Sequence, residues 1–119
     1  IWIVPKTRGG KPYWGAAKFP KTERAGRFVT LASGFDDDQA AGALPIRADA
    51  RVLGATVKAG ERTDYPLAAG RNAYLVVAKG EATVNGVRLG ERDGAAVRGE
   101  PALSIEATAD AELVLVDAP

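Results

Sequence analysis

The sequence has 119 residues, which suits one domain that can bury a core without disulfide bonds. It has no cysteine and no histidine, which excludes thiolate nucleophiles, Cys-bound zinc, a Ser-His-Asp triad and the commonest transition-metal ligand. The net charge of +1 is uneven, because residues 1–30 carry seven Lys and Arg against the single acid Glu23. No apolar run approaches the ~20 residues of a membrane span, and the start lacks the layout of a secretory signal. We therefore expect a soluble, cytoplasmic domain that, without a starting methionine, begins inside a longer protein.

Residues 1–26 are predicted to form an extended arm or interdomain linker. Residues 1–4 (IWIV) have the composition of a short strand, which Pro5 would end because proline has no N–H for a ladder. The stretch 5–26 holds three prolines and four glycines without a helical period. Its aromatic side chains, which are Tyr13, Trp14 and Phe19, are too apolar for a solvated linker. We expect the arm to lie against a surface, either of this domain or of a part outside this chain.

Residues 27–119 are predicted to form one domain of short β-strands. The acidic stretch 35–42 (FDDDQAAG) is predicted to be a loop, because consecutive Asp and Gly favour turns. Asn85-Gly86 is the strongest hairpin signal, since both positions tolerate a positive φ. The predicted strands are 27–32, 43–46, 51–57, 63–65, 72–79, 82–84, 87–89, 95–98, 103–107 and 112–117. Regular short strands without a convincing helix predict an all-β sandwich or barrel.

The spacing of glycines and turns between residues 60 and 97 forms two motifs. The first runs from Gly60 through five residues to Pro66, one to Ala68, four to Ala73 and six to Gly80. The second runs from Gly86 through five residues to Arg92-Asp93-Gly94 and two more to Val97. This spacing resembles the two cupin motifs, G-x5-H-x-H-x4-E-x6-G and G-x5-P-x-G-x2-H. The metal-ligand positions of those motifs fall on Pro66, Ala68, Ala73 and Val97, none of which has a donor atom in its side chain.

The sequence around these motifs resembles the C-terminal half of a pirin-like bicupin. The resemblance rests on residues 1–5, 43–57, 66–87, 93–97 and 100–117, and so extends over most of the chain. It implies a jelly-roll cupin barrel, with an N-terminal cupin of the same protein as partner. In the family, the N-terminal cupin carries His and Glu ligands for iron or another divalent metal, and the C-terminal one usually lacks them. Some members open quercetin with dioxygen, and others act as transcription-associated cofactors.

The motif positions also predict how the barrel is filled. With Ala73 facing inward, the alternation of a strand turns Leu75 and Val77 inward too. The four ligand positions are then expected to meet at the barrel centre. An iron or zinc site needs three or four N, O or S donors. We therefore expect an apolar core with no metal, no cofactor and no catalytic residue in this domain.

Other candidate sites are weaker. Asp36-Asp37-Asp38 could suggest Ca²⁺, but it lacks the spacing of an EF-hand loop and is predicted to be solvated. Four carboxylates flank the motifs and could act as acid and base if they were buried; they are Glu61, Asp64, Glu91 and Asp93. Because they adjoin glycines, we expect them to be exposed. Ser33 and Ser104 have no histidine to activate them.

Two functional hypotheses remain. The first is a non-catalytic partner domain that supports the metal-binding half of a quercetinase-type dioxygenase. The second is a binding module for a protein, a small molecule or nucleic acid, which would use the barrel mouth or the basic arm. The mouth would offer Tyr65, Arg71, Asn72 and Tyr74, although Tyr74 is expected to face outward. We prefer docking of the arm on an acidic neighbour to nucleic-acid binding, leave a homodimer open, and least favour an enzyme that uses carboxylates alone.

Overall fold

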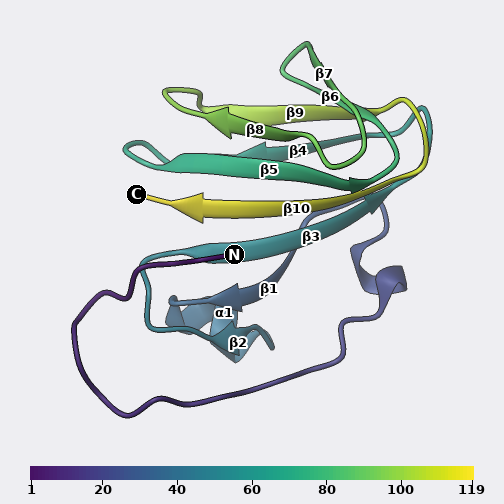
Figure 1. Ribbon diagram of the computed structural model, residues 1–119. Coiled ribbons are helices and arrows are strands. Elements are labelled where there is room, and N and C mark those ends of the chain that lie inside the picture. The colour runs from purple at the N-terminus through teal and green to yellow at the C-terminus, as the bar shows by residue number, and fades with distance from the viewer.

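The computed structural model describes residues 1–119 and consists of two β-sheets (Figure 1). The six-stranded sheet has the order β2 (Leu44–Pro45), β1 (Val29–Ser33), β3 (Arg51–Val57), β10 (Ala111–Ala118), β5 (Asn72–Lys79) and β8 (Gly94–Val97). The four-stranded sheet has the order β4 (Arg62–Pro66), β9 (Ala102–Ala107), β6 (Ala82–Val84) and β7 (Val87–Leu89). All strand pairs are antiparallel except β1 with β2. The prediction of an all-β fold is confirmed.

The hydrophobic core lies between the two sheets and draws side chains from both. On β5, Leu75 and Val77 are fully buried, as the alternation from Ala73 predicted, while Tyr74 is 52% exposed. On β10, Leu113 and Leu115 face the same core. Burial of each large aliphatic side chain contributes about 1.5–3 kcal/mol. β10 pairs with β3 on one side and β5 on the other, so it is a central strand of the larger sheet.

The arm differs from its prediction in two places. The strand predicted at residues 1–4 is wrong, because those residues are irregular and pair with no other strand. Only Lys6 makes a ladder-like bond nearby, by donating its backbone N–H to the Arg47 carbonyl at 2.7 Å. Later in the arm, η1 (Lys21–Arg24) forms one 3₁₀ turn. Residues 1–20 have no other regular element, as the prolines and glycines indicated.

The acidic loop predicted at residues 35–42 is also wrong, because it contains α1 (Asp36–Ala40). Three aspartates occupy the first turn of α1, where negative charge interacts favourably with the helix dipole. The turn is tied to the preceding strand, because the Gln39 amide donates to the Ser33 carbonyl at 3.0 Å. Gly42 follows with a φ of 109° and ends the helical turn.

Two motif glycines show different constraints. The hairpin at Asn85-Gly86 is confirmed: both residues have positive φ, 48° and 83°, and Val84 pairs with Val87 across the turn. At Gly80 the φ is 86°, and an added Cβ would lie 2.0 Å from the Asp110 carbonyl oxygen. Gly80 is thus required for its backbone conformation and for space. No helix in the structure is both long enough and apolar enough to cross a membrane.

Candidate functional site

The four positions predicted from the ligand motifs do not form one cluster. Ala73 on β5 lies opposite Val97 on β8, and these two side chains are 4% and 8% exposed. Pro66 ends β4 and is exposed, as is Ala68 in the loop between β4 and β5. The structure therefore brings together only Ala73 and Val97. All four side chains present carbon, so this set does not fit a transition metal. No group of three or more His, Cys, Asp or Glu could hold a metal ion.

A buried polar cluster occupies the same end of the barrel. Its centre is Asp117 on β10, which pairs with Ala73 on one side and Arg51 on the other and is 2% exposed. The Tyr65 hydroxyl donates to Asp117 Oδ2 at 2.6 Å, and Arg71 Nε donates to Oδ1 at 2.5 Å. Both carboxylate oxygens therefore have hydrogen-bond partners in a site almost closed to solvent, as a buried charge requires.

Arg71 connects this carboxylate to the opposite loop. Its Nη1 donates to Asp49 Oδ1 at 2.9 Å, and its Nη2 to the Asp49 carbonyl at 3.0 Å. Nη2 also reaches the Asp117 carbonyl at 3.3 Å. The guanidinium carbon lies 5.3 Å from the ring centre of Phe35, which adds a cation–π contact. With its side chain 13% exposed, Arg71 uses its donors within the protein.

Arg51 extends the cluster to α1. Its Nε donates to Asp38 Oδ2 at 2.6 Å, and its Nη1 lies 3.6 Å from Asp117 Oδ2. Ser33 Oγ donates to the same Asp38 oxygen at 2.6 Å. The guanidinium of Arg51 lies over the Phe35 ring at 4.1 Å. Two arginines and three aspartates thus join α1, β3, β10 and the turn before β5 in one ion-pair network.

The pKa shifts of Asp38 and Arg71 favour the charged forms of both side chains. Burial opposes ionisation of Asp38, but hydrogen bonds from Ser33 and Arg51 hold the pKa of that carboxyl below its ordinary value. Burial likewise opposes the positive charge of Arg71, and its contacts with Asp117 and Asp49 nevertheless raise its pKa. Burial, followed by the hydrogen bond to Asp117, raises the pKa of Tyr65. None of these three pKa values is shifted toward neutral pH, where the pKa of an efficient general acid or base lies. The cluster is suited to holding strand ends together.

Sequence reasoning found two of the eight residues of this site. Tyr65 and Arg71 were singled out as polar groups of the mouth, and both belong to the cluster. Asn72 and Tyr74 are exposed, and Tyr74 faces outward as predicted. The cluster members that were missed are Ser33, Phe35, Asp38, Asp49, Arg51 and Asp117. Asp117 had a signal, because it continues the inward series of β10 at an otherwise apolar set of positions.

The carboxylates that flank the motifs are exposed, as predicted. Asp93 Oδ2 accepts the Gly90 N–H at 2.9 Å, and Glu61 Oε2 accepts the Lys58 N–H at 3.2 Å, so both stabilise turns. The aspartates of α1 divide into two kinds. Asp36 and Asp37 are exposed, whereas the solvated position predicted for Asp38 is wrong because Ser33 and Arg51 bind it.

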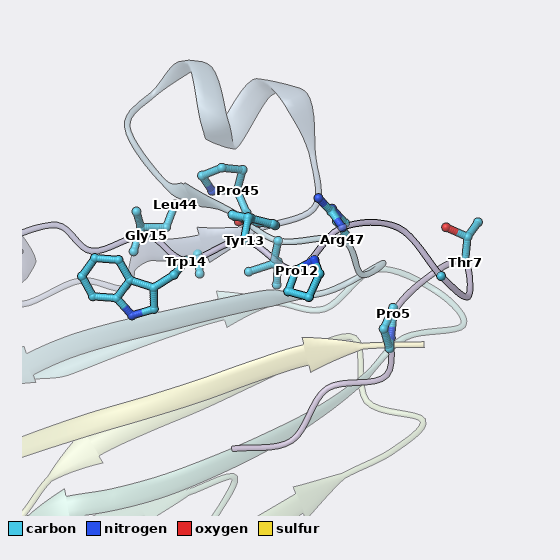
Figure 2. Close-up of a pocket in the computed structure, with 12 residues that line it drawn as sticks. Pro5, Thr7, Pro12, Tyr13, Trp14, Gly15, Leu44, Pro45 and Arg47 are labelled. Carbon is cyan, nitrogen blue, oxygen red and sulfur yellow. The ribbon is translucent and has the colours of Figure 1, made fainter.

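A surface groove of about 650 Å³ lies between the arm and the β1–β2 edge. Figure 2 shows Tyr13 beside Pro45, with Pro12 and Arg47 nearby and Trp14 farther along the arm. The Tyr13 hydroxyl donates to the Pro45 carbonyl, and the Arg47 guanidinium lies 4.7 Å from the Tyr13 ring centre. Trp14 is 88% exposed. Lys21 of η1 forms an ion pair with Glu112 on β10, so the basic arm docks in part on this domain.

Comparisons with known proteins agree with the fold and the motifs. Residues 30–118 match the family model described as the quercetinase C-terminal cupin domain. The chain is 63% identical over 118 residues to a pirin-like protein of Caulobacter vibrioides, covering 99% of this chain and 50% of that protein. It is 31% identical to quercetin 2,3-dioxygenase of Escherichia coli K12, covering 100% of this chain and 49% of that enzyme.

A solved structure gives the same relationship. The crystal structure of the bacterial pirin YhhW from Escherichia coli in complex with nickel(II) superposes with a TM-score of 0.88 at 30% identity. The match covers 99% of this chain and 48% of that one. The chain thus spans about half the length of the relatives it matches, which is consistent with a second cupin domain in the same protein. The expected cupin fold is confirmed, and the chain belongs to the quercetinase C-terminal cupin domain family.

Proposed function

We propose that this domain is a metal-free, non-catalytic cupin that supports a metal-binding N-terminal cupin of the same protein. The observation that carries the proposal is the end of the barrel at Ala73 and Val97. There the side chains at the motif positions are Ala73 and Val97, which have no donor atom for a metal. Both carboxylate oxygens of the neighbouring Asp117 accept hydrogen bonds, one from Tyr65 and one from Arg71. A metal ion would find no free donor set at this end, because the one buried carboxylate already has partners on both oxygens.

The relatives support an oxygenase as the parent protein. One is named quercetin 2,3-dioxygenase, and the structure of YhhW is of a complex with nickel(II). Each of them is twice as long as the matched region. We propose that the other half of the protein binds the metal and the substrate. The C-terminal cupin domain supplies a rigid, closed barrel beside that half.

The second hypothesis, a binding module, has less support. A hollow of about 410 Å³ opens over the barrel mouth, and it is lined by residues 67–72 and 99–101. Arg71 is its principal cationic group, and its hydrogen bonds to Asp49 and Asp117 leave it little capacity for a ligand.

Metal analysis tests the proposal. The full-length protein, loaded with nickel or iron and desalted, is expected to bind one equivalent. Asp117→Asn and Tyr65→Phe are expected to leave that content unchanged, because neither residue is a ligand. Two equivalents of tightly bound metal, or loss of metal in a variant that remains folded, would overturn the proposal.

A further inference from the structure

The outer surface of the six-stranded sheet carries an uninterrupted apolar stretch. Residues that face outward on neighbouring strands are in register: Val116 pairs with Val52 and with Tyr74, and Tyr74 pairs with Ala96. The adjacent row contains Val114 opposite Val76. We call these six residues the outer apolar face: Val52, Tyr74, Val76, Ala96, Val114 and Val116. None is charged, whereas the solvated face of an antiparallel sheet is normally polar.

Tyr74 lies flat on this face. A Cβ at Gly94 would fall 2.4 Å from the Tyr74 hydroxyl oxygen and 2.8 Å from its Cζ, so the ring extends over that glycine on the neighbouring strand. The absence of a side chain at Gly94 makes room for the ring. Tyr74 is nevertheless 52% exposed, so the surface it presents is broad and apolar and has no partner in this chain.

The arm contacts the outer side of the six-stranded sheet near Gly54 of β3 and Glu112 of β10. The Arg24 side chain reaches Gly54 on β3, where an added Cβ would lie 3.5 Å from its Cδ. Lys21 pairs with Glu112 at the start of β10. Lys21 and Arg24 of the arm therefore lie beside Glu112 and Gly54, at the end of the sheet that adjoins the outer apolar face.

A second exposed apolar segment lies beside the start of β3. Ile1, Trp2 and Val4 are 86%, 94% and 76% exposed. Ile3 and Pro5 border residues 46–48, which lead into β3. Both views place this part of the chain next to the strand ends of the larger sheet (Figures 1 and 2). An apolar sheet face with exposed Trp and Ile at its border has the composition of an interface core rather than of a solvated surface.

We propose that the outer apolar face, together with residues 1–4, is the surface on which the other half of the protein packs. This chain spans about half the length of its relatives, which is consistent with a domain of comparable size in the same polypeptide. This proposal rests on the proposed function in taking that domain to be the metal-binding cupin. A partner held in the same polypeptide needs no charged recognition, which suits a face without charges.

The test compares two apolar surface residues in the full-length protein. Tyr74 on β5 and Val87 on β7 are 52% and 60% exposed, and they lie on different sheets. Tyr74→Lys is expected to divide the calorimetric unfolding transition of the full-length protein into two. Val87→Lys is expected to leave one transition. Equal behaviour of the two variants would overturn the proposal.

Hydroxyl-radical footprinting of the unmodified full-length protein gives a test that needs no variant. Tyr74 is expected to be protected, and oxidation of Tyr74 at the rate of an unfolded control would overturn the proposal. Light scattering separates the competing occupant: a mass of two copies that falls to one in Tyr74→Lys would assign the face to a second copy and also overturn it. Metal content of the same samples reports on the proposed function alone, because the metal equivalents do not depend on which surface packs.

Discussion

Arg71 and Asp117 are 46 residues apart in the sequence and meet at 2.5 Å between Nε and Oδ1. The contact joins the entrance of β5 to the end of β10 at the barrel mouth, next to the pair Ala73 and Val97. The segments with the motif spacing form the barrel. This ion pair and its neighbours occupy the end of the barrel at which a cupin metal would be expected.

Asp117→Asn is expected to lower the free energy of unfolding by about 3–5 kcal/mol, because it leaves Arg71 and Arg51 without their shared buried carboxylate. Urea unfolding at neutral pH measures the change. Asp64→Asn on β4 is the control, because that residue is exposed and the substitution should cost less than about 0.5 kcal/mol. Equal losses in the two variants would contradict a role for the cluster in stability.

Tyr65 is expected to make stability depend on pH in the alkaline range. Its folded pKa lies above the ordinary value of 10.0, so its contribution is fully present below that value and is lost as pH rises through the folded pKa. Unfolding free energies measured between about pH 8 and pH 11 should fall less steeply in Tyr65→Phe than in the wild type. An unchanged slope in Tyr65→Phe would exclude this contribution.

Asp38 is expected to contribute in the acid range. Its folded pKa lies below the ordinary value of 3.8, so its contribution is present above that value and is lost as pH falls through the folded pKa. Asp38→Asn should therefore be less stable than the wild type at neutral pH and lose less stability on acidification. Asp37→Asn, one residue away and exposed, serves as the control. Parallel acid titrations of stability for Asp38→Asn and the wild type would show that the prediction fails.

Gly80→Ala is expected to be more destabilising than Gly86→Ala. Both glycines have φ near +85°, at 86° and 83°, so both substitutions carry the left-handed strain of about 1–2 kcal/mol. Only at Gly80 would the new Cβ also meet backbone, 2.0 Å from the Asp110 oxygen. The difference between the melting temperatures of the two variants measures the destabilisation caused by this steric clash. Equal melting temperatures would indicate that the loop before β10 moves aside without cost.

The sequence predicted those parts of the fold that depend on local pattern. Strand alternation placed Leu75 and Val77 in the core and Tyr74 outside it, and Asn85-Gly86 marked the hairpin. The errors arose where distant contacts decide. Residues 1–4 have strand composition but no neighbouring strand with which to pair.

The same reason explains the missed parts of the site. α1 forms in a stretch with turn composition, where Ser33 and Arg51 bind Asp38. Asp117 is a charged residue at the end of an apolar strand, and its burial depends on Arg71 and Tyr65, which lie 46 and 52 residues earlier. No local pattern indicates those partners.

The central position of β10 has a consequence for synthesis of the protein. During translation, β3 and β5 leave the ribosome with their facing edges unpaired, because the strand between them is β10. Until residues 111–118 have emerged, these edges are open to wrong pairing with other chains. These two strand edges therefore stay unpaired until about 40 residues beyond β5 have emerged, as expected for a fold dominated by long-range strand pairs.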